Sequence, residues 1–524
     1  MGIPSYYRRL VESVPSLIGK VQIGTTCDWL WIDFNCIVYH CLRRPGAPVW
    51  NGLSGATEFE AGLRRSVIQY VDYLISCVGP VGGVGLAVDG IVPAAKRRQQ
   101  RLRRVEAKEG ASLKEGWDTN AITPGTAFMN DLMADLERWR VGRARVRPEM
   151  KWLVSPCTEP GEGEHKIMSW LRSLQNDKRE SHMIYGLDAD LILLTMLNNV
   201  CYMPNHEFKL YREDQKGGEG LYNHEGKEKM LTFSLDSLIN HIVEKMPVPD
   251  AAVADWIKDY VFAMSVLGND FVPCMMSLSL KDEGHGLLLE MLGRVWRKGG
   301  RLCDTHVQGE GWRMLFEEIA MGEKERVVKS ALAKRGQAAR QEEGPCHWFV
   351  EEALFHTLPC AKGTYLQLRD DWQDVAVTRF SGLRGHAAAI REHQAEEYMR
   401  GLHWIYNYYM FGAEGLDFDW YYSSWLAPFA LDVAFVTSSC GSATSGIGST
   451  MPTPEEQLAL VLPKQSWRLL AGSSCEVFIK KGAEWFGQPS VYSSIGKRMR
   501  WECHLNMPSP LLRDLRRVIS SDER

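Results

Sequence analysis

The sequence predicts an α/β protein: a mostly parallel β-sheet flanked by helices, followed by a largely helical C-terminal region. Short apolar runs alternate with helical patterns through the first half of the chain, which is typical of parallel sheets. Acidic residues directly follow several of those runs, and beyond about residue 275 the pattern is mainly helical. With 524 residues and 45% apolar content, the chain can bury more than one core. We therefore expect two domains, 1–275 and 276–524, or one elaborated domain.

The expected strands are short apolar runs that end at a turn or at an acidic residue. They lie near residues 28–33, 84–88, 151–155 and 183–187. Residues 253–267 have a helical pattern and end shortly before Asp270. Polar stretches predict a loop or hairpin at 213–229, a solvated charged helix at 324–343 and a loop rich in Gly, Ser and Thr at 437–450.

Seven carboxylates follow apolar runs in five separate segments, DWLWID, GLAVD, PGEGEHK, YGLDAD and LGND. They are Asp33, Asp89, Glu162, Glu164, Asp188, Asp190 and Asp270. Side chains at the carboxyl ends of parallel strands converge on one crevice, so we expect these acids to meet. Gathered anions repel one another, and hard divalent cations with oxygen ligands relieve that repulsion. Many enzymes that hydrolyse phosphodiesters bind two such ions in the active site.

A single acid after a strand is more often a solvated loop residue or a helix N-cap than a ligand. Glu162 with Glu164, and Asp188 with Asp190, each offer two carboxylates across a tight bend, and a helix follows each pair. The helix dipole would by itself explain acids at those two places. It does not explain acids in five segments, so we interpret the set as a metal site.

A basic helix is expected to begin at Pro93, just after Asp89, in the segment AVDGIVPAAKRRQQRLRR. Spacings of three and four place four of its residues on one face, Lys96, Gln100, Arg103 and Arg104. Three more cations lie beside that face, Arg97, Arg98 and Arg101. A charge run is usually a solvated face. Because this run begins so close to Asp89, we expect its face to lie by the crevice and to hold a phosphate near the metals.

Composition and charge exclude several classes of protein. A net charge of −4 and a pI near 6.4 argue against a protein that coats nucleic acid by bulk electrostatics, so nucleic-acid contacts must be local. The 13 cysteines include no C-x-x-C and no paired Cys/His spacing, which predicts reduced thiols and no zinc site. We recognise no signal peptide, myristoylation pattern or membrane span. We expect an intracellular protein, cytoplasmic or nuclear, and not a secreted one.

Aromatic residues are concentrated between positions 404 and 425. They are Trp404, Tyr406, Tyr408, Tyr409, Phe411, Phe418, Trp420, Tyr421, Tyr422 and Trp425. Such residues are more often core than ligand platforms. Unpaired bases nevertheless stack on aromatic rings, at roughly 1 to 3 kcal/mol per base, so one or two of these residues are candidates for base stacking.

The motifs together resemble the Xrn-type family of 5′-to-3′ exoribonucleases. MGIPSYYRRL, LWIDFNCIVYHC, the basic segment, DTNAITPGTAFM, PGEGEHKIM, YGLDADLILL and LGNDFVP follow the family in sequence and spacing. A weaker likeness continues through HWIYNYYMFG, WLAPFA, PEEQLALVLP and IGKRMRWECHL, so the resemblance covers nearly the whole chain. It implies a PIN/flap-nuclease-like core. It also implies processive hydrolysis of single-stranded RNA, from a 5′-monophosphate end to mononucleotides, with two Mg²⁺ ions or with Mn²⁺.

The resemblance also assigns roles to residues. It implies that the seven acids hold the metals and that Lys96, Gln100, Arg103 and Arg104 bind the 5′-phosphate. The family clamps the first nucleotide between a histidine and a tryptophan. The histidine position is Tyr39 here, with His40 one residue away, and the tryptophan is Trp404, with Trp420 as the alternative.

The expected mechanism is in-line hydrolysis by a metal-bound hydroxide, with a second cation at the leaving 3′-oxygen. Direct metal ligands are expected to be Asp33, Glu164, Asp188 and Asp190. Asp89 and Glu162 are expected to act through water, since Mg²⁺ dehydrates reluctantly. Lys166 is either a phosphate contact or a surface lysine, and His165 is expected to be structural.

Two other classes remain open. A structure-specific DNA flap nuclease shares an acidic cluster at strand ends, although the basic pocket after Asp89 favours a free 5′-phosphate end. A catalytically inactive RNA-binding scaffold has no reason to keep seven clustered acids. We expect a monomer without membrane association. The sequence identifies no protein partner and no natural RNA target.

Overall fold

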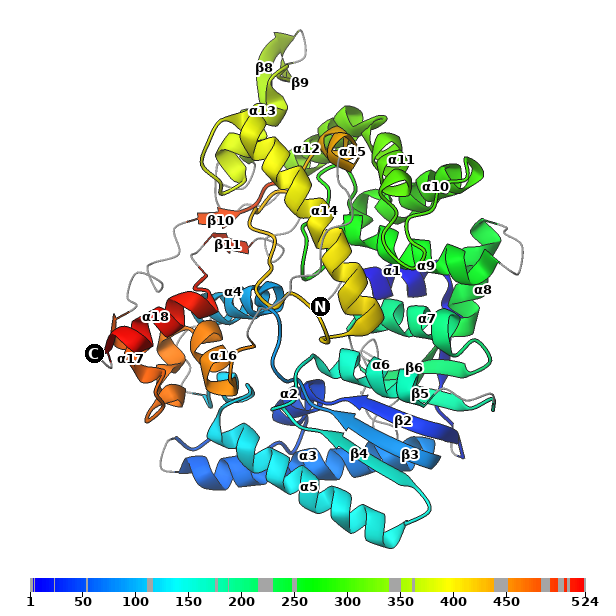
Figure 1. The fold of residues 1–524 in the computed structure, drawn as a ribbon, viewed down its shortest axis with the longest axis vertical. Coiled ribbons are helices and arrows are strands. Elements are labelled where there is room, and N and C mark those ends of the chain that lie inside the picture. Colours follow the sequence, from blue (N-terminus) through cyan, green and yellow to red (C-terminus); the bar gives the residue numbers. More distant parts are fainter. Residues whose placement is uncertain are drawn as a thin grey trace.

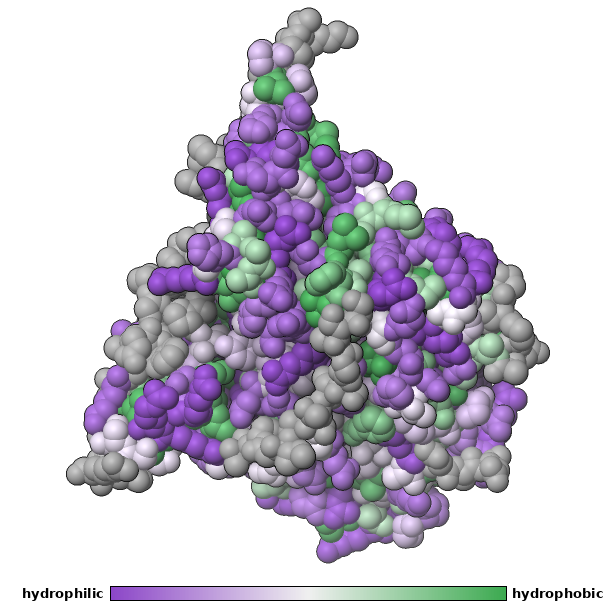
Figure 2. Space-filling model, turned by 45° about the horizontal axis from the view of Figure 1, so that its top comes forward, coloured by the Kyte–Doolittle hydropathy of each residue, from purple (hydrophilic) through white to green (hydrophobic). Residues whose placement is uncertain are grey.

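The computed structural model describes most of the chain. The described residues are 3, 5–22, 24–52, 55–110, 116–174, 178–186, 188–214, 230–246, 252–338, 350–360, 363–437, 451–481, 491–497, 504–506 and 509–522. Within these ranges, no helix combines the length and the apolar content needed to cross a membrane. On the face shown in Figure 2, hydrophilic residues predominate and apolar residues form separate patches.

A seven-stranded sheet forms the base of the molecule, and its strand order is β1-β7-β6-β5-β2-β3-β4 (Figure 1). The strands are β1 (Ile18–Lys20), β2 (Cys27–Asp33), β3 (Pro80–Ala87), β4 (Lys151–Ser155), β5 (Ser181–Tyr185), β6 (Glu207–Glu213) and β7 (Met230–Ser234). The five from β6 to β4 are parallel, whereas β7 pairs antiparallel with β6 and with β1. Two further two-stranded sheets pair β8 (Phe355–Cys360) with β9 (Gly363–Leu368), and β10 (Val491–Ser493) with β11 (His504–Asn506).

The strand order creates a topological switch point at β2. From β2 the chain continues to β3 and β4 on one side, and then returns to place β5 on the other side. In open α/β sheets, a crevice opens beyond the carboxyl ends of the strands at such a point. The last residue of β2 is Asp33, which therefore faces this crevice.

Some helices cover the two faces of the sheet, and the others build the rest of the chain. They are α1 (Tyr6–Ser13), α2 (Asn35–Arg43), α3 (Ala56–Val78), α4 (Ala94–Gly110), α5 (Ala127–Val146), α6 (Gly163–Ser173), α7 (Asp190–Tyr202), α8 (Leu235–Lys245), α9 (Val253–Ala263), α10 (Gly284–Arg297), α11 (Gly309–Ala320), α12 (Glu323–Ala338), α13 (Trp372–Phe380), α14 (Ala387–Phe411), α15 (Ala430–Thr437), α16 (Pro454–Val461), α17 (Glu476–Lys481) and α18 (Leu512–Asp522). Short 3-10 helices include η5 (Met264–Leu267), which continues α9.

The side chains of β2 alternate between two apolar cores. Leu30 and Ile32 belong to the core beneath α2, α3 and α5, whereas Trp29 and Trp31 face the opposite core with α6 and α7. Because a parallel strand in the middle of a sheet is buried on both faces, it reads as a nearly continuous apolar run, which explains DWLWID.

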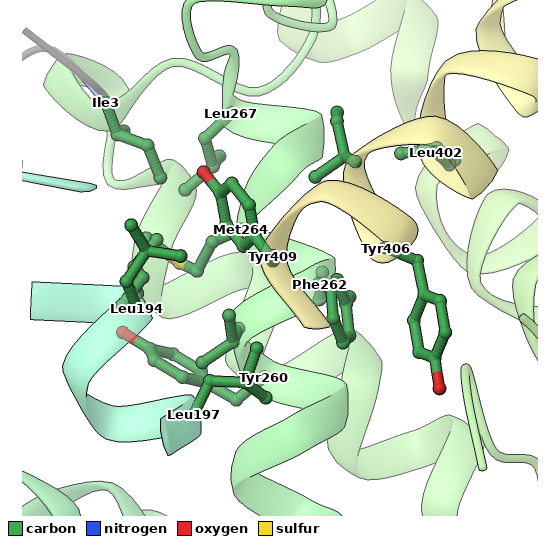
Figure 3. Packing of buried hydrophobic residues seen from close by; sticks show 14 of the residues in the cluster. Ile3, Leu194, Leu197, Tyr260, Phe262, Met264, Leu267, Leu402, Tyr406 and Tyr409 are labelled. Atoms are coloured by element: carbon green, nitrogen blue, oxygen red, sulfur yellow. The ribbon is translucent and has the colours of Figure 1, made fainter. Parts of the chain in front are cut away.

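The second core joins the two halves of the chain. Figure 3 shows Leu402, Tyr406 and Tyr409 of α14 packed beside Phe262 and Met264, with Leu194 and Leu197 of α7 nearby. Figure 1 shows the C-terminal end of α14 lying over α7 and α6. The largest apolar cluster thus contains residues from both sides of position 275, and the division there stays a prediction.

The four strands expected from the sequence are confirmed with shifted ends. Residues 28–33, 84–88, 151–155 and 183–187 correspond to β2, β3, β4 and β5. Residues 253–267 are helical as expected, and the final turn is a 3-10 helix. Most of residues 213–229 and of residues 437–450 lies outside the described residues. Strands β6 and β7, which lie before and after residues 214–229, pair antiparallel. Strands β1, β6 and β7 were not expected from the sequence.

Candidate active site

The seven acids lie in one cluster at the carboxyl edge of the sheet. Asp33 ends β2, Asp89 follows β3, the two glutamates begin α6, Asp188 and Asp190 begin α7, and Asp270 follows η5. The Asp33 carboxylate interacts electrostatically with Asp89, Asp188 and Glu162. Asp190 and Glu162 both interact with Asp270, and Glu164 interacts with Glu162 and Asp33. The fold therefore brings together all the acids that the sequence singled out.

Burial makes this concentration of negative charge costly. Desolvation, reinforced by neighbouring carboxylates, raises the pKa values of Asp33 and Glu164 well above their ordinary values. The same causes raise the pKa of Asp190 to about 7, and burial raises the pKa of Glu162 despite a nearby lysine. Such a set can remain ionised only if cations compensate it.

Glycine allows the acids to approach one another closely. The N–H of Gly163 donates to Asp89 Oδ1 at 2.8 Å, and a Cβ at position 163 would lie 2.4 Å from Asp33 Oδ1. A side chain at position 163 would therefore push Asp33 out of place. This explains why a glycine separates Glu162 from Glu164 in PGEGEHK.

The donor set fits a hard divalent cation. One carboxylate oxygen of Glu162, one of Glu164 and one ring nitrogen of His165 all lie within 4.8 Å of one another. His165, however, stacks on Tyr408 with ring centroids 3.7 Å apart, and burial lowers its pKa well below the ordinary value. This contact agrees with a structural role. Asp190 Oδ1 is buried without a hydrogen-bond partner, so this oxygen is available to bind a metal ion.

Lys96 belongs to the acid cluster as much as to the basic helix. Its Nζ lies 2.7 Å from Asp270 Oδ2 and forms a second ion pair with Glu162. Burial alone would raise the pKa of Asp270. The positive charge of Lys96 outweighs this effect, and the pKa falls to about 2. The sequence placed Lys96 in a phosphate pocket, whereas the structure places its ammonium group between two of the predicted metal ligands.

The other residues of that face leave polar atoms without partners. Gln100 Oε1 and Arg104 Nη1 are buried and have no hydrogen-bond partner, and Arg103 is exposed. Burial lowers the pKa of Arg104 to about 10, while Tyr39 and Asp89 act on it in the opposite direction. The guanidinium of Arg104 thus interacts electrostatically with Tyr39 of α2 and with Asp89 of the acid cluster, and its Nη1 is a donor available for an anion.

The candidate stacking residues differ in their surroundings. Tyr39 is half-buried on α2 and lies near Arg104. His40 instead stacks on Tyr70, with ring centroids 4.5 Å apart. Trp404 is only 5% exposed, and its Nε1 donates to the carbonyl of Asp417 at 2.8 Å.

Both candidate tryptophans are packed in the core. Their ring centroids lie 5.1 Å apart, and Trp404 also contacts Phe271 and Tyr408. The Nε1 of Trp420 is buried without a hydrogen-bond partner. In this structure neither ring presents an open face, so a nucleotide would need a side-chain rearrangement to reach one.

Tyr408, Gln457 and Lys166 support the acid cluster through contacts that were not predicted from the sequence. The hydroxyl of Tyr408 donates to Glu162 Oε1 at 2.9 Å. The Gln457 amide, from α16, accepts from the N–H of Val92 at 2.7 Å and donates to the carbonyl of Gly90 at 2.9 Å. All three hydrogen bonds join residues more than two hundred positions apart, and no local pattern marks them.

Lys166 is not a surface lysine. It is 8% exposed, and its Nζ donates to the carbonyls of Val88 and Pro156 at 2.7 and 2.8 Å. Burial lowers its pKa to about 8. Lys166 therefore holds the loop before Asp89 against the loop before Glu162, and its donors point to main-chain oxygens.

Family models match two parts of the chain. The family described as "XRN 5'-3' exonuclease N-terminus" matches residues 1–214, and the family described as "Xrn1 helical domain" matches residues 376–474. The chain is 29% identical over 418 residues to 5'-3' exoribonuclease 2 of Aspergillus oryzae, which covers 62% of this chain and 39% of that protein. It is also 29% identical over 348 residues to 5'-3' exoribonuclease 2 of Schizosaccharomyces pombe, covering 55% and 33%.

The chain thus spans well under half the length of these curated relatives. Among solved structures, the catalytic core of Rad2 in complex with DNA matches with a TM-score of 0.32 and 14% identity, over 62% of this chain and 81% of that one. A TM-score this low carries no functional information.

Proposed function

Because the chain belongs to the XRN family of 5'-3' exonucleases, we propose that it hydrolyses single-stranded RNA from a 5′-monophosphate end, processively and to mononucleotides. The observation that carries this proposal is the convergence of seven buried or half-buried acids from five segments on one crevice. Burial of so many carboxylates without a cation would be strongly unfavourable, and a phosphodiesterase needs such a metal site.

Two Mg²⁺ ions, or Mn²⁺ in their place, are the proposed cofactors. When bound, they would supply a hydroxide nucleophile at neutral pH and stabilise the leaving 3′-oxygen. Asp33, Glu164, Asp188 and Asp190 would hold them directly, and Asp89 and Glu162 would act through water. Asp270 completes the set and, together with Glu162, pairs with the ammonium group of Lys96.

The basic face of α4 would select the 5′ end. Gln100 and Arg104 have buried polar atoms without partners, and Arg103 is exposed beside them. A terminal monophosphate carries up to two charges and three exposed oxygens, so charge-assisted hydrogen bonds from this face would hold it. Lys96 would add a fourth contact if it leaves the carboxylates.

The first base would stack on Tyr39. Tyr39 is half-buried and adjacent to Arg104, so a base beside a bound terminal phosphate lies within its reach. Trp404, or alternatively Trp420, would form the other side of the clamp after the rearrangement described above.

The test compares four RNAs of one sequence that carry a 5′-monophosphate, hydroxyl, triphosphate or cap. We expect the monophosphorylated RNA to be degraded much faster than the other three, with release of mononucleotides. Arg103→Ala should remove most of the preference over hydroxyl RNA. Equal rates for all four ends would favour the flap-nuclease alternative, which a DNA flap substrate then tests. Absence of hydrolysis with Mg²⁺ and with Mn²⁺ would favour the scaffold.

We propose further that the protein acts as a monomer inside the cell, in the cytoplasm or the nucleus. The cysteines whose side chains the structure describes are free thiols, which is typical of a reducing compartment. Size-exclusion chromatography with light scattering tests the monomer, and imaging of the tagged full-length protein tests the compartment.

A further inference from the structure

Tyr408 connects the helical C-terminal part of the chain to the acid cluster. It lies on α14 and its side chain is completely buried. Its hydroxyl donates to Glu162 Oε1 at 2.9 Å, across 246 positions of the sequence. Because Glu162 is the residue from which α6 begins, this hydrogen bond ties α14 to the segment that carries two of the seven acids.

The ring of Tyr408 is held in place by residues that adjoin the acids. It stacks on His165, with centroids 3.7 Å apart and planes 19° from parallel, and Phe271 meets it edge-on at 5.7 Å. His165 directly follows Glu164 in the chain, and Phe271 directly follows Asp270. A ring packed against both segments has few other rotamers, so the position of its hydroxyl is fixed relative to the cluster.

Both carboxylate oxygens of Glu162 have partners. Oε1 accepts from Tyr408, and Oε2 forms an ion pair with the ammonium group of Lys96. Asp190 differs, because its Oδ1 is buried without a hydrogen-bond partner. Glu162 is thus engaged as a holder of Lys96, which agrees with the proposal that it acts on the metals through water rather than directly.

These contacts form a continuous chain from α14 into the middle of the cluster. The chain runs from Tyr408 to Glu162, from Glu162 to Lys96, and from Lys96 to Asp270, whose Oδ2 lies 2.7 Å from the lysine nitrogen. Hydrogen bonds that involve an ionised group are roughly twice as strong as neutral ones. Without the hydroxyl, Glu162 Oε1 would be buried without this donor, and the carboxylate could turn and move Lys96 with it.

We propose that Tyr408 is a positioning residue for the reaction. Its hydroxyl fixes the Glu162 carboxylate in the orientation that holds Lys96 beside Asp270, and it offsets part of the negative charge of the acid cluster. The effect on the reaction rests on the proposed function, because the cluster cleaves RNA only if the protein is a nuclease. The effect on charge compensation does not depend on hydrolysis.

Tyr406 provides a matched control on the same helix. It lies two residues before Tyr408, which places it about 200° around the helix. Its side chain is also buried, and its hydroxyl donates to the carbonyl of Asp304 at 3.1 Å. Figure 3 shows its ring beside Phe262, with centroids 4.9 Å apart. Tyr406→Phe therefore removes one buried hydroxyl from α14 without removing a contact to the acids.

Kinetics test the positioning role. Tyr408→Phe should lower kcat on 5′-monophosphorylated RNA by about fivefold or more at saturating Mg²⁺, because the Glu162 carboxylate is no longer fixed. Its affinity for the same RNA in EDTA, measured by fluorescence anisotropy, should equal that of the parent, since Tyr408 is buried and touches no substrate. Tyr406→Phe should keep the parent kcat. Equal kcat values for the two variants would overturn the positioning role.

Thermal unfolding in EDTA and in Mg²⁺ tests charge compensation without any need for activity. The Mg²⁺-dependent rise in melting temperature should be about 1–3 °C larger for Tyr408→Phe than for the parent, because a cation can compensate the oxygen that has lost its donor. Tyr406→Phe should melt lower under both conditions and show the parent's rise. A rise for Tyr408→Phe that does not exceed the parent's would reduce Tyr408 to a packing residue.

Failure of the proposed function has a different signature. A parent protein that hydrolyses no RNA with Mg²⁺ or Mn²⁺ would refute the nuclease and with it the effect on kcat. The melting comparison would still decide whether the Tyr408 hydroxyl acts on the acid cluster. An active parent, with two phenylalanine variants that behave alike in both measurements, would refute this inference alone.

Discussion

The ammonium group of Lys96 lies 2.7 Å from the carboxylate of Asp270, inside the cluster of acids that would bind metal. A lysine from the basic helix α4 therefore supplies positive charge where the proposed ions would sit. Metal binding and the position of Lys96 are linked, because both compensate the same carboxylates.

Replacing Lys96 with Met should make the protein depend more strongly on metal for stability. Removing one partner of a buried ion pair costs about 3–5 kcal/mol, so the variant should melt well below the parent in EDTA. Mg²⁺ should recover much of that loss, and its stabilising effect should exceed the effect on the parent. An equal Mg²⁺-dependent shift in both proteins would show that Lys96 and the ions do not share ligands.

Asp188→Asn combined with Asp190→Asn should abolish hydrolysis and leave RNA binding intact. The two amides have nearly the same shape as the carboxylates but cannot supply their charge to a divalent cation. Rates with Mg²⁺ and anisotropy titrations with 5′-monophosphorylated RNA measure the two properties separately. Degradation at the parent rate would remove both residues from the metal site.

The metal-free protein should lose stability as the pH rises from about 4 to about 7. Burial and Asp270 raise the pKa of Asp190 from 3.8 to about 7, so in this window the folded state holds a proton that the unfolded chain has released. The loss should be on the order of 2–4 kcal/mol. Urea unfolding in EDTA at pH 5 and pH 7.5 measures it. Asp190→Asn should flatten the dependence, and an unchanged slope in this variant would contradict the assignment.

Tyr39→Ala should slow turnover, whereas Tyr39→His should retain much of it, because either aromatic ring can cover a base. Trp404→Ala should show a similar defect together with a lower melting temperature, since Trp404 is 5% exposed and packed in the core. Single-turnover rates and thermal unfolding separate the two effects. Full activity of Tyr39→Ala would make Tyr39 a packing residue.

Gln457→Leu should lower kcat more than it weakens RNA binding. The amide holds both Gly90 and Val92, between Asp89 and the basic helix, and each buried main-chain group left unpaired costs roughly 1–3 kcal/mol. Gln457→Glu keeps the acceptor for Val92 and should be the milder change. Equal kcat values for the leucine variant and the parent, at a temperature where both are folded, would limit Gln457 to a structural role.

The parallel strands and the acid cluster were predictable because their determinants are local. A buried strand reads as an apolar run, and an acid at its end must lie at the carboxyl edge of the sheet, as Asp33 does. The antiparallel pairing of β7 with β1 was not predictable, because it joins segments more than two hundred residues apart.

The partners of charged side chains were the least predictable part of the site. Six cations in nine residues look alike in sequence, yet Lys96 meets carboxylates and Arg101 meets the carbonyl of Leu460. Which role each takes depends on the segments that pack against the helix, and those segments come from the other end of the chain.

The two hydrogen bonds of Gln457 also set the order in which the site is completed during synthesis. All seven acids leave the ribosome before residue 271, but the loop after Asp89 gains its clamp only when α16 has emerged. An N-terminal portion that folds early would hold its acids without this support. A growing chain therefore lacks this support for the acid cluster until Gln457 and the rest of α16 have emerged.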